Sequence, residues 1–136
     1  MKTRKPTLEE IEELVSFLPI LYAKGFTPIK KWHIESQNGF SSFPWPEYDD
    51  AVEKFFLLAS KECWRDYNYL SKNALRMLED EDIIKNADID KIKTMLTFCV
   101  RGERFCDGHW AAMIEKGYIL RLLQRLSELK SKPDLL

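Results

Sequence analysis

Apolar side chains recur every third or fourth residue in two long segments of this chain, and this spacing limits what the chain can fold into. On an α-helix such residues form one continuous face, which must be buried against other elements. The first segment opens with Thr7 and Glu10, a capping-box pair, and the second follows Gly117, a residue type that commonly ends a helix. The two apolar faces are Leu8, Ile11, Leu14, Val15 and Leu18, and Ile119, Leu122, Leu123, Leu126 and Leu129. The spacing predicts a helix in each segment, and we expect the second helix to dock on the protein's own core.

The same spacing predicts further helices between these two. Residues 47–61 and 70–79 each carry apolar side chains at helical positions, Asp80 can cap a short turn, and Asp88 can cap a long helix. With 136 residues the chain has the length of one domain with a single core. We therefore expect one all-α or mainly α domain over residues 1–136, built as a compact bundle of five to seven helices.

Residues 26–46 do not fit the helical pattern. Several prolines disfavour a helix there, and Gln37-Asn38-Gly39 is a tight-turn sequence. Two structures fit: a small β-hairpin that pairs residues 29–35 with 40–43, and an ordered aromatic loop near 29–45. We expect the aromatic side chains to pack as a lid over the helical core, with a ligand site as the alternative. They are Trp32, Phe40, Phe43, Trp45 and Tyr48.

Composition and charge exclude several classes of protein. Hydrophobic residues make up 45% of the chain and charged residues 32%, which is typical of globular proteins and not of disordered ones. The longest apolar stretch, residues 14–23, is too short and too interrupted to span a membrane. The 21 basic and 22 acidic residues leave no net field that would attract nucleic acid. Three cysteines are too few for a secreted disulfide framework, and no signal-peptide pattern follows the basic N-terminus. The sequence predicts a cytoplasmic protein that binds neither membranes nor nucleic acid.

One polar segment, residues 101–110, interrupts the helical pattern, and two backbone arrangements fit it. In the first, a single helix over residues 89–114 places the carboxylate of Glu103 on its apolar face, where a charge must be paired or neutralised. In the second, which the two glycines of the segment favour, Asp107 caps a new helix over residues 108–116 and Glu103 moves to a surface turn.

The cysteines near this segment raise the question of a metal. Cys99, Cys106 and His109 are ligand-type side chains, and Cys-x-x-His is half of a common zinc pattern. A structural zinc site normally shows two short spacings, whereas this sequence has one. We therefore expect no metal and no cofactor, with Cys99 and Cys106 as reduced thiols buried on the apolar face.

The charged residues of the segment support three further hypotheses. Glu103, Asp107 and His109 are the residue types of acid–base catalysis, although no nucleophile or nucleotide-binding motif accompanies them. Four arginines offer guanidinium groups for phosphate or carboxylate: Arg101, Arg104, Arg121 and Arg125. We favour a structural clamp, in which Arg101 or Arg104 forms a partly buried bidentate contact with a carboxylate from another helix.

Residues 94–110 also carry a resemblance to a known family. They match the pattern Thr-x-x-x-Arg-x-x-Arg-Phe-x-x-Gly at Thr97, Arg101, Arg104, Phe105 and Gly108. In this pattern, and over most of the chain, the sequence resembles a family of small bacterial and archaeal proteins known as domain of unknown function 6508. The resemblance implies a mainly helical fold and carries no activity, cofactor or catalytic residue.

Two hypotheses for function follow. The leading one is a non-enzymatic binding or regulatory module, monomeric or homodimeric, whose protein or small-molecule partner meets residues 101–110. The alternative is a small enzyme that uses Glu103, Asp107 and His109 as acid–base groups, which requires these three side chains to converge in a pocket. The candidate residues for binding or for the clamp are Arg101, Glu103, Arg104, Asp107, His109 and Trp110.

Overall fold

The computed structural model describes residues 2–34, 36–37, 40–41 and 44–136, and in them the chain is mainly helical, as predicted. The described residues form eight α-helices, more than the five to seven expected, because three of them are only four or five residues long. The helices are α1 Leu8–Val15, α2 Leu18–Leu21, α3 Asp50–Ala59, α4 Ala74–Leu78, α5 Glu81–Lys85, α6 Ile89–Arg101, α7 His109–Glu115 and α8 Tyr118–Ser131. Short 3₁₀ turns connect several of them: η1 Glu62–Trp64, η2 Tyr69–Lys72, η3 Gly102–Arg104 and η4 Pro133–Leu135.

Three of the predicted helix caps, at Thr7, Asp80 and Asp88, are confirmed. The Thr7 side chain accepts a hydrogen bond from the backbone N–H of Glu10, and the Glu10 carboxylate accepts one from the N–H of Thr7, which completes the capping box of α1. Asp80 caps α5 and Asp88 caps α6, each through a side-chain oxygen that accepts from backbone N–H groups of the first turn. Asp49 caps α3 in the same way.

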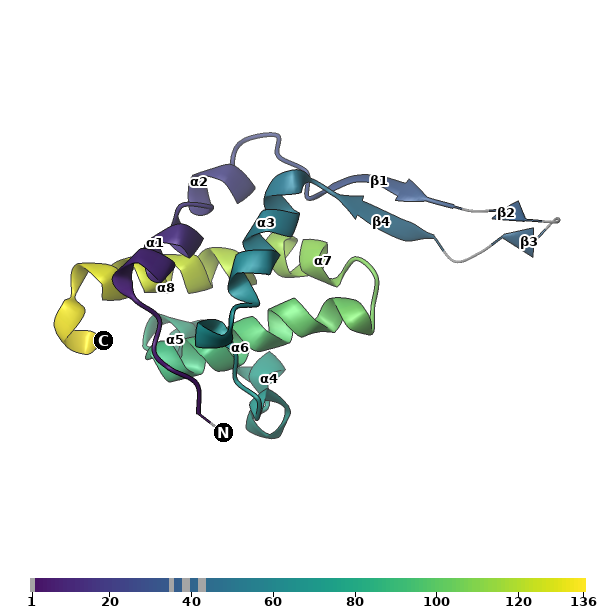
Figure 1. Ribbon diagram of the computed structural model, residues 1–136. Helices are drawn as coiled ribbons and strands as arrows, with labels where there is room; N and C mark the ends of the chain where they lie inside the picture. The colour runs from purple at the N-terminus through teal and green to yellow at the C-terminus, as the bar shows by residue number, and fades with distance from the viewer. Residues whose placement is uncertain (1, 35, 38–39, 42–43) are drawn as a thin grey trace.

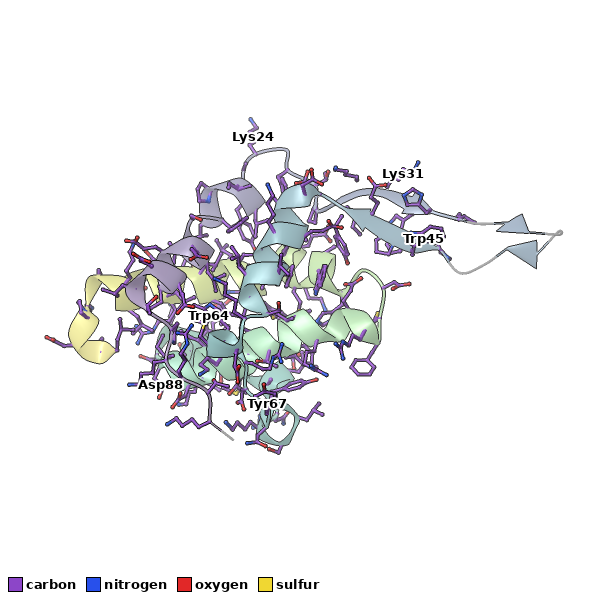
Figure 2. The ribbon with its side chains drawn as sticks, in the orientation of Figure 1. Lys24, Lys31, Trp45, Trp64, Tyr67 and Asp88 are labelled. Carbon is purple, nitrogen blue, oxygen red and sulfur yellow. The ribbon has the colours of Figure 1, made fainter. Side chains whose placement is uncertain are left out.

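The core forms around α6 and α8, with α1 and α3 packed against them (Figure 1). The predicted apolar face of α8 is fully buried, at 0 to 1% exposure for each of its five residues, so the last helix docks on the protein's own core as expected. Tyr22 joins α2 to the α7–α8 junction, because its hydroxyl donates to the carbonyl of Ile114 and accepts from the N–H of Leu120. In Figure 2, Trp64 lies inside this helical body and is 1% exposed.

A two-stranded ribbon projects from the helices (Figure 1). Strand β1 (Ile29–His33) pairs antiparallel with β4 (Trp45–Tyr48), and β2 (Ser36–Gln37) pairs with β3 (Phe40–Ser41) further out. The hairpin is therefore longer than the predicted pairing of 29–35 with 40–43, and β1 finds its partner beyond residue 43. Residues 38 and 39 of the predicted turn lie outside the described residues.

The described aromatic residues of the ribbon cover the helices only in part. Trp32 is 47% exposed and Trp45 is 39% exposed, and Trp45 lies out on the ribbon in Figure 2. Only Tyr48, at the base of β4, is buried among the helices. The side chain of Phe40 and all of Phe43 lie outside what the structure describes. The lid prediction is wrong for Trp45, which stacks on His33 out on the ribbon. The Trp32 ring is half-exposed but reaches back to Gly108 at the start of α7.

Across the described residues, no helix combines the length and the apolar character that crossing a membrane requires.

Candidate functional site

A groove of about 630 Å³ opens between α3 and the C-terminal end of α6, and we call it the α3–α6 groove. Its lining combines apolar side chains with three arginines. The apolar side chains are Phe56, Leu57, Ala59, Val100 and Trp110, and the arginines are Arg65, Arg101 and Arg104. Glu53, Ser60, Thr97 and Glu103 complete the lining. The groove therefore includes four of the six candidate residues: Arg101, Glu103, Arg104 and Trp110.

Glu103 fixes the end of the groove by capping α7. Its Oε1 accepts hydrogen bonds from the backbone N–H of Trp110 at 2.8 Å and from the hydroxyl of Tyr48 at 2.7 Å. Its Oε2 accepts from the N–H of Gly108 at 2.9 Å. Burial, followed by this contact with Glu103, raises the pKa of Tyr48, so its hydroxyl stays protonated and donates.

The predicted break between two helices is confirmed, but the predicted cap is wrong. The chain leaves α6 at Arg101, turns through η3 and enters α7 at His109. Gly108 occupies the cap position with φ of 88°, a left-handed conformation that favours glycine. Asp107 is exposed and does not cap the helix; the carboxylate of Glu103 takes that role from the preceding turn. Only the three-dimensional turn shows that Glu103 reaches these N–H groups.

Trp110 forms a fixed part of the apolar wall. Its indole N–H donates to the carbonyl of Val100 at 2.9 Å, and its ring stacks on Phe56 with centroids 4.6 Å apart and planes 5° from parallel. The Tyr48 ring also packs against it, with centroids 5.2 Å apart and planes tilted by 43°. An aromatic ring held by two neighbouring rings and at its N–H loses little freedom when another group packs against it.

Arg101 and Arg104 do not form the predicted clamp. Neither guanidinium makes an ion pair or hydrogen bond to any residue in the described part of the chain. Carboxylates of other helices pair with other cations, for example Asp50 with Lys30 and Glu81 with Arg121. Arg101 is half-buried and Arg104 is exposed, so both keep contact with water in the groove.

Arg65 is the third arginine of the groove, and its position is set by the backbone around it. Its Nη2 donates to the carbonyl of Ser60 at 3.0 Å, and its guanidinium lies 5.6 Å from the centre of the Tyr67 ring. Thr97 anchors the same loop, because its Oγ1 accepts from the N–H of Asp66 at 2.9 Å and donates to the carbonyl of Lys93.

His109 packs against the turn η3, which joins α6 to α7. Its ring lies directly against the backbone of Gly102 and edge-on to Phe98 at 5.3 Å, with Nε2 3.3 Å from the Phe98 carbonyl. Burial lowers the pKa of His109 below its usual 6.5, so the ring is neutral at pH 7.

The sequence matches one known family over most of its length. The model of the Family of unknown function (DUF6508) matches residues 6–132. The chain belongs to this family. No curated protein and no solved structure matches it.

The positions of the family-like pattern have distinct places in this DUF6508 protein. Thr97 anchors the loop that presents Arg65, Arg101 and Arg104 lie on the groove, and Gly108 provides the left-handed turn into α7. Phe105 is 79% exposed and contributes to none of these contacts.

The three acid–base candidates are not assembled in this DUF6508 protein. Of Glu103, Asp107 and His109, only Glu103 lines the groove, and no hydrogen bond joins any two of them in the described residues. Both oxygens of Glu103 already accept from backbone N–H groups. The groove lining combines apolar side chains with arginines, and the three acid–base candidates do not meet in it.

The cysteine prediction is half right. Cys99 is buried and burial raises its pKa, but Cys106 is exposed. The error arises because the helix ends at Gly102, so a single helical projection misplaces every later residue. Within the described residues, no three His, Cys, Asp or Glu side chains come close enough to hold a metal ion together.

Arg121 and Arg125 form no open anion patch. Arg121 pairs with Glu81 at 3.2 Å, and Arg125 pairs with Glu128 while its Nε donates to the carbonyl of Ala87. Both guanidinium groups are therefore engaged within the protein.

Sequence reasoning missed the α3 side of the groove. Phe56 and Leu57 form its wall, and Arg65 reaches it from the loop after η1. Leu57 carried a usable signal, because it lies off the buried face of α3 and is 73% exposed. Nothing local marks Arg65, whose placement depends on the contact of its loop with α6.

Proposed function

We propose that this DUF6508 protein is a non-enzymatic binding module that holds its ligand in the α3–α6 groove. The observation that carries the proposal is the pairing of an apolar wall with Arg101 and Arg104, which have no ion-pair partner among the described residues. Guanidinium groups that face water beside apolar surface are the features of a binding site rather than of a packed core.

The alternative, an enzyme that uses Glu103, Asp107 and His109, has less support. Of the three candidate residues only Glu103 lines the groove, and both of its carboxylate oxygens already accept hydrogen bonds from backbone N–H groups at the start of α7. A general base must reach the proton it removes, and the Glu103 oxygens already face the N–H groups of Gly108 and Trp110 and the Tyr48 hydroxyl. These contacts favour binding over catalysis.

The proposal includes a cytoplasmic location and a partner that is not nucleic acid. Three free thiols, two of them buried, fit a reducing compartment. A formal net charge of −1 does not favour a polyanion such as nucleic acid.

Chemical-shift mapping by NMR tests the proposal. We use two flat aromatic probes of equal size, 2-naphthoate and its neutral amide 2-naphthamide, each added to ¹⁵N-labelled protein. The expected result is that at least one probe shifts amide signals of Leu57, Val100 and Trp110, while signals along the buried face of α8 stay unchanged.

Two exposed leucines provide the matched control. Leu57→Ser removes apolar surface from the groove and should weaken probe binding, whereas Leu70→Ser, 80% exposed on η2, should not. Shifts confined to the β1–β4 ribbon, or no binding by either probe, contradict the proposal.

A further inference from the structure

The unused hydrogen-bonding groups of the α3–α6 groove restrict the ligand it can take. Each guanidinium is a donor with no acceptor, and those of Arg101 and Arg104 have no partner among the described residues. The groove's other polar atoms are largely occupied: Glu103 by N–H and O–H donors, Thr97 by Asp66 and Lys93, and the Trp110 N–H by Val100. A ligand that complements these two guanidinium groups must supply acceptor oxygens.

The charged residues of the groove also favour a ligand with acceptor oxygens. Three arginines line the groove against two carboxylates, and Glu103 is held at one end as the cap of α7. The other carboxylate, Glu53, lies exposed on the rim of α3 and opposes an anion there. The α6 end of the groove, where Arg101 and Arg104 lie, is therefore the more favourable place for an anion.

The backbone at that end makes both arginines necessary. Arg101 is the last residue of α6 and Arg104 the last of η3, so the C-terminal carbonyl groups of α6 lie close by, although those of Phe98 and Val100 already accept hydrogen bonds. These carbonyls carry partial negative charge, which disfavours an anion unless neighbouring cations outweigh it. Two guanidinium groups can do so, and each can grip an oxyanion through two parallel hydrogen bonds.

The size of the groove selects the kind of ligand. About 630 Å³ falls within the range of about 300–1000 Å³ that is typical of small-molecule sites. The apolar wall of Phe56, Val100 and the stacked Trp110 ring suits a flat or aliphatic body of that size.

We propose that the α3–α6 groove binds a small molecule with an apolar body and one oxyanion, a carboxylate or a phosphate monoester, gripped by Arg101 and Arg104. This inference rests on the proposed function, since it names the ligand class of the same groove. The apolar body packs on Trp110 and Val100 and stays clear of Glu53.

Isothermal titration with three probes tests the inference: 2-naphthoate, 2-naphthyl phosphate and neutral 2-naphthamide. At least one anionic probe should bind at least about tenfold more tightly than the amide, a difference of about 1.4 kcal/mol. The tighter of the two anions identifies the oxyanion. Raising the salt concentration should weaken the anionic probes and leave the amide unchanged.

Arginine variants assign the effect to residues. Arg101→Gln with Arg104→Gln should remove the preference for the anion and leave amide binding intact, because neither side chain supports the fold through a described contact. Arg76 is exposed on α4 and does not line the groove, so Arg76→Gln is the matched control and should keep the preference for the anion. Arg101→Lys with Arg104→Lys should retain part of the preference for the anion, since lysine keeps the charge without the bidentate geometry.

Three results overturn the inference, and they separate it from the proposed function. Equal affinity of the anions and the amide in the groove refutes the oxyanion and leaves the binding module standing. A preference that survives in the double glutamine variant refutes the assignment to Arg101 and Arg104. Absence of all three probes from the groove refutes both the inference and the proposed function.

Discussion

Replacement of Gly102 by alanine tests how the turn beneath the groove is packed. Gly102 has φ of −61°, which any residue adopts, so no backbone requirement explains the glycine. A Cβ atom built there would collide with Nε2, Cε1 and Cδ2 of the His109 ring. The structure thus attributes the glycine to the imidazole that covers it.

Two opposing effects set the size of the expected change. In a helical conformation, replacing glycine by alanine raises the free energy of unfolding by about 0.5–1 kcal/mol, because alanine restricts the unfolded chain. Overpacking against a held ring costs about 1–3 kcal/mol. The ring has little room to yield, since Phe98 contacts it both edge-on and through its carbonyl. Gly102→Ala should therefore lower the free energy of unfolding by about 1–2 kcal/mol.

A double-mutant cycle checks this reasoning by urea unfolding. In a His109→Ala background the collision is gone, so Gly102→Ala should be neutral or raise the free energy of unfolding by about 0.5–1 kcal/mol. The change of sign between the two backgrounds is the diagnostic result. An equal loss in both, or no loss with His109 present, refutes the proposed packing.

Four further predictions concern separate parts of the molecule. Leu122→Ala, at a fully buried position of α8, should lower the free energy of unfolding by about 2–5 kcal/mol; an unchanged melting temperature contradicts its place in the core. His109 has a folded-state pKa below its unfolded value of about 6.5, so the unfolded chain takes up its proton first as pH falls. Stability should then decline from pH 6.5 downward in the wild type and more shallowly in His109→Gln, as thermal melts from pH 7.5 to 5.5 can show. Of the three thiols, only Cys106 should react promptly with a thiol reagent in the folded protein, since Cys99 and Cys63 are buried; labelling of all three at equal rates contradicts this. Glu53→Gln should strengthen binding of 2-naphthoate by up to about fivefold and leave 2-naphthamide unchanged, because an exposed like charge is worth at most about 1 kcal/mol.

The sequence predicted the helices well where the deciding contacts are local. The capping box of Thr7 and Glu10 and the cap of Asp88 each join residues three apart, so the pattern contains both partners. The apolar face of α8 was predicted correctly because one continuous stripe has only one way to be buried. Periodicity and caps together are sufficient for such elements.

The candidate site was predicted only in part, because its contacts join distant segments. The clamp failed because the sequence shows that acidic residues exist but not which cations they meet; Asp50 and Glu81 pair with Lys30 and Arg121. Cys106 was misplaced because the 3₁₀ turn η3, residues 102–104, resets the helical register. Arg65 was missed because the contact of its loop with Thr97 brings it to the groove.

The most direct measurement of the central claim is ¹⁵N–¹H NMR of the arginine Nε–Hε groups during a titration with 2-naphthoate. The Nε–Hε signals of Arg101 and Arg104 should shift together and saturate along the same binding curve. The signals of Arg76, outside the groove, and of Arg125, which is bonded to the Ala87 carbonyl, should stay in place. A titration in which 2-naphthoate binds while the Arg101 and Arg104 signals remain fixed contradicts the account.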